Sequence, residues 1–119
     1  MKKTLVFGAS LKPSRYSFMA VQRLVASGIE TVAFGLRAGE VGGVQIKTSL
    51  KHIGEIHTIT LYLNPKRQEE YYQAILALAP DRVIFNPGTE NPELYDLLKN
   101  NGIEVEVACT LVLLGTNQY

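Results

Sequence analysis

The sequence has very little cysteine and no apolar run long enough for a membrane span. Cys109 is the single cysteine among 119 residues, which excludes an intramolecular disulfide and a pair of cysteine metal ligands. A membrane-spanning helix needs roughly 20 consecutive apolar residues, and no segment approaches that length. The short apolar run after Lys2-Lys3 stops at Ser10 and no cleavage-like stretch follows it. We therefore expect a cytoplasmic protein without a membrane partner.

The chain also lacks an excess of either charge. It has 12 basic and 11 acidic residues, for a formal net charge of +1. Proteins that bind duplex nucleic acid usually present a broad basic surface, so we expect no nucleic-acid partner. A few local cations are still enough to hold a small anion.

Groupings typical of metal sites or acid–base catalysis are missing as well. His52 and His57 are five residues apart, which is neither the i, i+4 spacing of a helical metal pair nor part of a Cys/His cluster. Glu69-Glu70 has the character of a solvated face. Cys109, with either histidine as base, is the best nucleophile on offer, but a free cysteine more often packs as a small apolar residue. The sequence predicts no metal ligand and no catalytic residue, and it favours a binding role while leaving enzymatic activity open.

Two hydrophobic periods alternate along the chain. Short apolar or β-branched runs predict strands, and apolar residues spaced three or four apart predict helices. The expected strands are 5–7, 31–34, 56–63, 83–85 and an edge strand over 103–107, and the expected helices are 14–28, 68–79 and 91–102. The glycine-rich stretch 35–47 is expected to be a loop with a short extended piece at 44–46, and 49–53 a brief helical turn. The conformation of 110–115 is left open.

Alternating strands and helices of this length predict an α/β fold. Parallel neighbouring strands need long crossovers, and right-handed crossovers lead to a doubly wound sheet. We expect one domain over residues 1–119, with a doubly wound parallel sheet of about five strands flanked by helices. Ligands of such sheets bind outside the carboxyl ends of the strands, where the strand order reverses.

The first of these strand ends is followed by the segment GASLKPSR. Gly8 permits a tight turn, and the amides at the start of the next helix are suited to a phosphate oxygen. Ser10 supplies a hydroxyl group, and Lys12 and Arg15 supply positive charge. The dinucleotide glycine fingerprint is incomplete, because Ser10 and Pro13 stand at its second and third glycine positions. An ordinary strand-to-helix turn with solvated cations is the alternative.

The end of the second strand lacks the acidic residue that holds the ribose of NAD in many dinucleotide domains. Phe34-Gly35-Leu36-Arg37 has no acid, and the next one is Glu40. Arg37 suits a phosphorylated ribose, which NADP and coenzyme A both carry. Two further strand ends, Tyr62 to Lys66 and Asn86 to Glu90, form rigid turns that should converge on the same sheet edge.

These segments, in this order, resemble the small coenzyme A-binding domain family. The matching stretches are GASLKPSR, YLNPKRQEEY, FNPGTENPEL and EVACTLVLLGT. The family is Rossmann-like and is similar to the nucleotide domain of succinyl-CoA synthetase alpha subunits. Where many relatives have Asn-Pro after the second strand, this chain has Gly35-Leu36.

The resemblance implies a ligand whose diphosphate lies over the first loop. It places Gly8, Ala9, Ser10, Lys12 and Arg15 around phosphate, Phe34, Gly35, Leu36 and Arg37 on the adenosine side, and Leu63, Asn64 and Pro65 on the far wall. The predicted site also includes Asn86, Pro87 and Gly88 from the fourth strand end.

Three functions remain open at this point. The first is a module that binds coenzyme A or an acyl-CoA, and the second is an NADP-binding component of an oxidoreductase. The third is a structural or interaction domain whose nucleotide site has decayed. The expected ligand is a small nucleotide. A further expectation is a second copy of the chain, in contact through the apolar C-terminal segment or the edge strand, or else a partner enzyme.

Overall fold

The computed structural model describes residues 2–119 and consists of one seven-stranded sheet with helices on both faces. The strands lie in the order β3-β4-β2-β1-β5-β6-β7, and all neighbours are parallel except β3 and β4. The strands are β1 (Thr4–Phe7), β2 (Thr31–Phe34), β3 (Gly39–Val41), β4 (Val44–Lys47), β5 (Thr58–Leu61), β6 (Arg82–Phe85) and β7 (Glu104–Val107).

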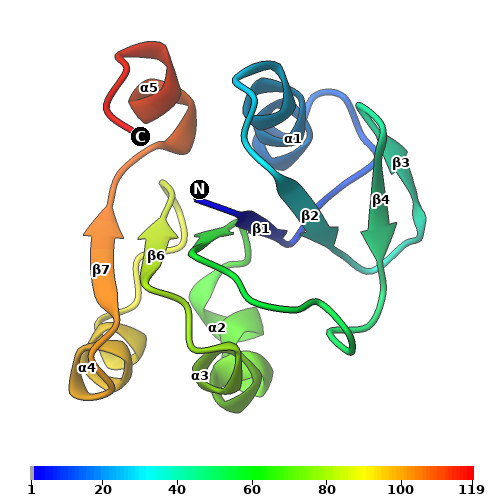
Figure 1. Cartoon of the computed structure of the whole chain (residues 1–119). Coiled ribbons are helices and arrows are strands. Elements are labelled where there is room, and N and C mark those ends of the chain that lie inside the picture. The colour runs from blue at the N-terminus through cyan, green and yellow to red at the C-terminus, as the bar shows by residue number, and fades with distance from the viewer. Residues whose placement is uncertain (1) are drawn as a thin grey trace.

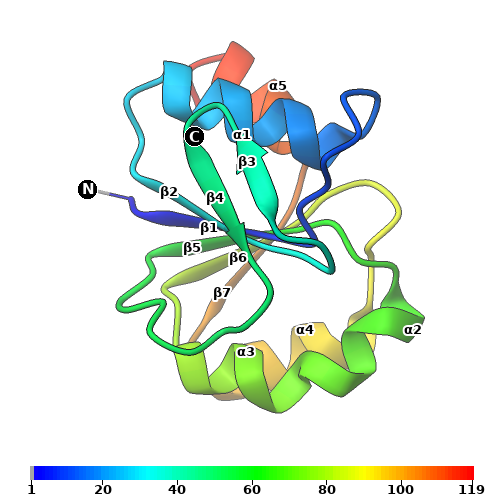
Figure 2. The same cartoon turned by 90° about the vertical axis from the view of Figure 1, so that its right-hand side faces the viewer.

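The helices divide between the two faces of this sheet (Figure 1 and Figure 2). Helices α1 (Tyr16–Ala26) and α5 (Thr110–Gly115) cover one face. The other face carries α2 (Pro65–Gln68), the 3-10 turn η1 (Glu69–Tyr71), α3 (Tyr72–Leu78) and α4 (Pro92–Asn100). The predicted doubly wound α/β fold is therefore confirmed.

Seven strands are present where about five were expected. The additional strands, β3 and β4, form an antiparallel hairpin in the stretch that was expected to be mostly loop. Its turn is Gly42-Gly43, and both glycines have positive φ angles, 55° and 85°, which side chains disfavour. The short extended piece at 44–46 was predicted correctly. Its pairing with β2, Ala33 opposite Ile46, joins the hairpin to the sheet.

Alternating side chains of the central strands form a core on each face. In β1, Leu5 and Phe7 pack into the cluster under α3 and α4, and Val6 packs into the cluster under α1. All three side chains are fully buried. Successive residues of a strand point to opposite faces, so an apolar run on a central strand serves both cores at once.

Several helix boundaries differ from the expectation. Helix α1 begins at Tyr16, two residues later than expected, and its buried residues include Ala20 and Leu24, whereas Val25 is 40% exposed. The second predicted helix begins earlier, at Pro65, where the side chain of Asn64 caps it. Residues 49–53 contain a turn at 51–52 and no helix, so the predicted helical turn was wrong. Residues 110–115, left open, form α5.

Asn86 links three elements at the carboxyl end of β6. Its Nδ2 donates hydrogen bonds to Thr60 Oγ1 at 2.8 Å and to the Leu61 carbonyl at 3.0 Å, and its Oδ1 accepts from the Thr110 amide at 2.8 Å. The side chain is nearly fully buried. Asn86 therefore joins β5, β6 and the start of α5.

We expect Asn86→Ala to lower the free energy of unfolding by about 2 to 4 kcal/mol, because it leaves buried donors and acceptors without partners. Urea denaturation measures the change. The control is Asn100→Ala on exposed helix surface, which should change the value by about 0.5 kcal/mol or less. Equal losses in the two variants would contradict the linking role of Asn86.

Candidate functional site

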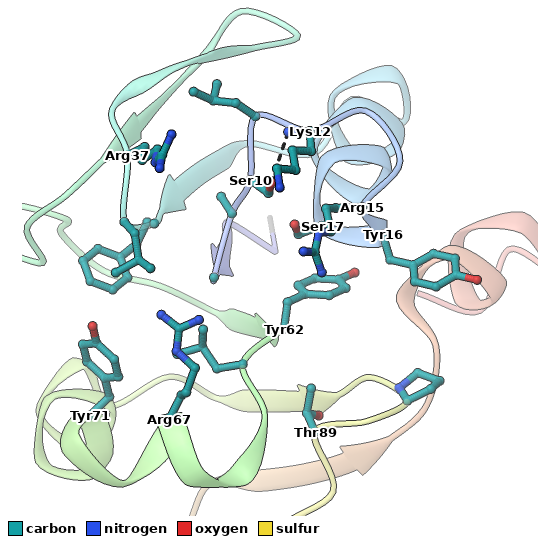
Figure 3. Close-up of a pocket in the computed structure, with 18 residues that line it drawn as sticks. Ser10, Lys12, Arg15, Tyr16, Ser17, Arg37, Tyr62, Arg67, Tyr71 and Thr89 are labelled. Carbon is teal, nitrogen blue, oxygen red and sulfur yellow. Dashed lines mark hydrogen bonds between the residues drawn. The ribbon is translucent and has the colours of Figure 1, made fainter.

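A cleft of about 540 Å³ opens at the carboxyl ends of β1, β2, β5 and β6 (Figure 3). This volume lies in the range typical of small-molecule sites. The lining residues come from the four segments that follow these strands, and they are Gly8, Ala9, Ser10, Leu11, Lys12, Arg15, Tyr16, Ser17, Phe34, Gly35, Leu36, Arg37, Tyr62, Leu63, Arg67, Tyr71, Pro87 and Thr89. The strand order reverses here. After β1 the chain first adds β2 on one side of it, and it later returns to add β5 on the other side of β1.

The loop between β1 and α1 is tied to the end of β2 by backbone contacts. The amides of Gly8 and Ala9 both donate to the Phe34 carbonyl, at 2.9 and 2.8 Å. A Cβ atom at position 35 would overlap the carbonyl oxygen of Ala9, so the close approach of the two segments requires Gly35. These two amides are therefore used within the fold and do not face a ligand.

Open backbone donors lie instead at the start of α1. The first amides of any α-helix have no partner within the helix. The residue at the N-cap of α1 is Arg15, which makes no side-chain cap hydrogen bond, and the first turn contains no acidic residue. Just before it, Ser10 Oγ accepts from the Lys12 amide at 3.1 Å and shapes the loop. The positive end of the α1 dipole therefore lies at the same wall of the cleft as Lys12 and Arg15.

Four cationic side chains line the cleft, and they are Lys12, Arg15, Arg37 and Arg67. The lining includes no aspartate or glutamate among the described residues. Within residues 2–119, the ion pairs of the protein involve other cations, so none of these four is neutralised by a carboxylate. A concave site with positive charge of this kind attracts a multiply charged anion.

An aromatic group forms the apolar wall beside β2. Phe34 and Tyr71 pack edge-to-face with ring centroids 5.6 Å apart, and both rings contact Phe7 in the core, at 5.0 and 5.2 Å. Leu36 stands at the rim and is 68% exposed. Rigid rings behind an exposed apolar rim suit a flat heterocycle.

Tyr62 lines the cleft away from this apolar wall, directly after the end of β5. Figure 3 shows the Arg15 side chain directed toward this tyrosine. Burial raises the pKa of Tyr62 to about 12, because desolvation disfavours the phenolate more than the nearby hydroxyls of Thr60 and Thr110 favour it.

Most residues predicted from the sequence meet in this cleft. Gly8, Ala9, Ser10, Lys12, Arg15, Phe34, Gly35, Leu36, Arg37, Leu63 and Pro87 all line it. Asn64, Pro65, Asn86 and Gly88 do not. Asn64 caps α2 by accepting from the Arg67 amide at 2.9 Å, Pro65 is the first residue of that helix, and the Gly88 amide donates to Glu90 Oε1 at 2.8 Å. For all the residues predicted from the sequence, inside the cleft or outside it, contact with a ligand stays a prediction.

The structure adds lining residues that the sequence reasoning missed. Tyr71 and Arg67 come from η1 and α2, and Tyr16 and Ser17 come from the first turn of α1. A signal for Arg67 was present, because Asn64-Pro65 is a capping residue followed by proline, the same start that predicts α4 at Asn91-Pro92. No local sequence signal identifies Tyr71.

Cys109 and His57 lie at opposite ends of the sheet. Cys109 is the N-cap of α5 and follows the carboxyl end of β7, whereas His57 precedes β5, with its Nε2 3.6 Å from Asp81 Oδ2. Because β5, β6 and β7 are parallel, these positions cannot form a nucleophile–base pair. In the part of the chain that the structure describes, no three His, Cys, Asp or Glu residues are grouped so as to hold a metal ion.

The comparisons with known proteins agree with this geometry. The family model described as CoA binding domain matches residues 2–115. The chain belongs to this family. A search among curated proteins finds no match.

Solved structures similar to this CoA binding domain cover nearly all of it. A crystal structure of an uncharacterised protein has 46% identity and a TM-score of 0.96, over 100% of this chain and 98% of that one. A protein from Thermus thermophilus has 25% identity and a TM-score of 0.87, over 99% and 90% of the two chains. A hypothetical protein from Pyrococcus horikoshii, at 23% identity and a TM-score of 0.86 over 98% and 83% of the two chains, shares the fold.

Among residues 2–119, no helix is both long and apolar enough to cross a membrane.

We expect Gly35→Ala to lower the free energy of unfolding by about 1 to 3 kcal/mol, since the new methyl group must displace the Ala9 carbonyl. Urea denaturation checks this. The control is Gly115→Ala in α5, where a Cβ atom would lie 3.6 Å from Arg23 Nη2, an ordinary contact. That variant should be neutral or more stable by about 1 kcal/mol at most. A Gly35→Ala protein as stable as the control would refute the close approach.

The stability of the protein should fall between about pH 10 and pH 12, in part through Tyr62. The neutral phenol is favoured in the fold, so this contribution is complete below the ordinary pKa of 10 and is lost as the pH rises toward 12. We expect Tyr62→Phe to lose less stability than wild type over this interval, measured by urea denaturation at each pH. Tyr16→Phe, which alters a 69% exposed side chain, is the control. Identical pH profiles for Tyr62→Phe and wild type would contradict the prediction.

Proposed function

We propose that the protein binds coenzyme A, or an acyl derivative of it, in the cleft at the carboxyl ends of the strands. The observation that carries this proposal is the set of four cations without carboxylate partners around a cleft of about 540 Å³. Membership in the CoA binding domain family supports the same class of ligand.

The charge of coenzyme A matches that of the cleft. Its diphosphate carries two negative charges, and its ribose carries a phosphomonoester with a charge of about −1.5 to −2 near neutral pH. Lys12, Arg15, Arg37 and Arg67 supply four positive charges. Charge-assisted hydrogen bonds from lysine and arginine to phosphate are about twice as strong as neutral ones.

The chemistry of the two ends of the cleft supports one orientation of the ligand. We assign the diphosphate to the loop over Ser10 to Arg15 and to the first amides of α1. The adenine base packs beside Phe34, Leu36 and Tyr71, which form the apolar wall. The pantetheine arm then runs toward Tyr62 and Thr89 at the other end. This orientation leaves the acyl end directed away from β2.

A binding role is the function that this arrangement supports best. The residues around the cleft supply positive charge, backbone donors and an apolar wall, which are the elements of ligand recognition. NADP is a second candidate, because Arg37 at the end of β2 also suits the phosphate on its ribose. The following experiment separates the two ligands.

We expect coenzyme A to raise the melting temperature, dephospho-coenzyme A to raise it less, and NAD to change it little. A ligand at a hundred times its dissociation constant adds about 2.7 kcal/mol of stability. Thermal denaturation with each nucleotide measures the shift. A shift with NADP alone would replace coenzyme A by NADP as the ligand, and no shift with any nucleotide would refute a nucleotide site.

Replacing Lys12 and Arg15 together by alanine should abolish the shift with coenzyme A. Both side chains are exposed, so the stability without ligand should change by about 0.5 kcal/mol or less. The matched control replaces Lys47 and Lys99, two exposed cations outside the cleft, and should retain the shift. Equal loss of the shift in both double variants would mean that overall charge, and not the loop, attracts the ligand.

A further inference from the structure

We propose that Arg67 binds the phosphate on the ribose of the ligand and makes the cleft selective for nucleotides that carry this group. This inference rests on the proposed function and extends it to one residue and one chemical group. Arg67 belongs to α2, on the opposite side of the sheet from α1. It therefore reaches the cleft from the wall that faces the β1–α1 loop.

Arg67 lies in the adenosine half of the cleft. Figure 3 shows its side chain rising from α2 between Tyr71 and Tyr62, with Arg37 on the far wall beyond it. Tyr71 follows Arg67 by four residues along a nearly continuous helical segment, so the two side chains share one face. Arg37 follows the end of β2, whose Phe34 packs against Tyr71 at 5.6 Å. A ligand group between the two arginines thus lies beside the apolar wall assigned to the adenine.

The backbone that carries Arg67 is held firmly while its side chain is exposed. The Arg67 amide donates to Asn64 Oδ1 at 2.9 Å. The next residue, Gln68, is fully buried, and its Nε2 donates to the carbonyls of Leu63 and Thr89 at 2.8 and 2.9 Å. Asn91 Nδ2 in turn donates to Gln68 Oε1 at 2.8 Å. This anchoring reduces the cost of ordering the guanidinium on a ligand, because only side-chain freedom is lost.

The count of charges assigns Arg67 to the phosphomonoester. Lys12, Arg15 and the start of α1 already provide two charges and backbone donors for the diphosphate. A phosphomonoester carries nearly two negative charges and three acceptor oxygens. Arg37 alone supplies one charge, and Arg67 supplies the second. Two guanidinium forks from opposite walls can each make paired hydrogen bonds to a phosphate.

The test measures the dissociation constants of coenzyme A and dephospho-coenzyme A by isothermal titration calorimetry. These ligands differ only in the ribose phosphate. We expect Arg67→Ala to weaken coenzyme A binding about tenfold and dephospho-coenzyme A binding less than about twofold. The control is Lys66→Ala, which removes the neighbouring exposed cation of α2 outside the cleft and should change either constant less than about twofold.

Each other outcome overturns the inference in an identifiable way. Equal weakening of both ligands by Arg67→Ala would assign Arg67 to the diphosphate, and no weakening would remove it from the site. The same loss of affinity in Lys66→Ala would mean that overall charge, and not a specific contact of Arg67, accounts for the weaker binding. If wild-type protein binds neither ligand, the proposed function itself fails, whereas binding of both with equal affinity refutes only the selectivity.

Discussion

The carbonyl oxygen of Phe34 accepts hydrogen bonds from both Gly8 and Ala9, and the cleft depends on this shared acceptor. It joins the loop after β1 to the end of β2, so the two segments that face the ligand from this side form one unit. Gly35 allows the backbones to approach, because any side chain there would overlap the Ala9 carbonyl. The position of Lys12 and Arg15 on this loop therefore depends on a contact between backbone groups, and the side chains of Lys12 and Arg15 take no part in that contact.

Charge is distributed unevenly along the strands, although the net charge of the chain is close to zero. The ion pairs Lys3–Glu30 and His57–Asp81 join residues that just precede strands, and Arg82–Glu106 joins the first residue of β6 to the third residue of β7. Lys12, Arg15, Arg37 and Arg67, which follow the carboxyl ends of β1, β2 and β5, line the cleft without carboxylates. Composition alone conceals this separation. The same chain thus has ion pairs that support the fold and, apart from them, a positively charged cleft suited to an anion.

Two segments with the same chemistry show how far local reasoning extends. Asn91-Pro92 predicts the start of α4 correctly, since an asparagine cap and a proline at the first position favour a helix. Asn64-Pro65 has the same signal and starts α2, but it was interpreted as a turn of the binding site. Of the β3–β4 hairpin only the extended piece at 44–46 was predicted, because both strands are short and lie in a glycine-rich stretch, and the pairing of β4 with β2 is a tertiary contact.

The sequence by itself determined the alternation of strands and helices, the doubly wound class of the sheet and the four segments at its carboxyl edge. These features are encoded locally, in hydrophobic periods, caps and glycine turns. Only the tertiary structure decided which side chains share the cleft. The packing of the chain brought Arg67 and Tyr71 into the cleft and gave Asn86 a role in the core. The reason is that burial, and which side chains face one another across a cleft, depend on how distant segments pack and not on the residues adjacent in sequence.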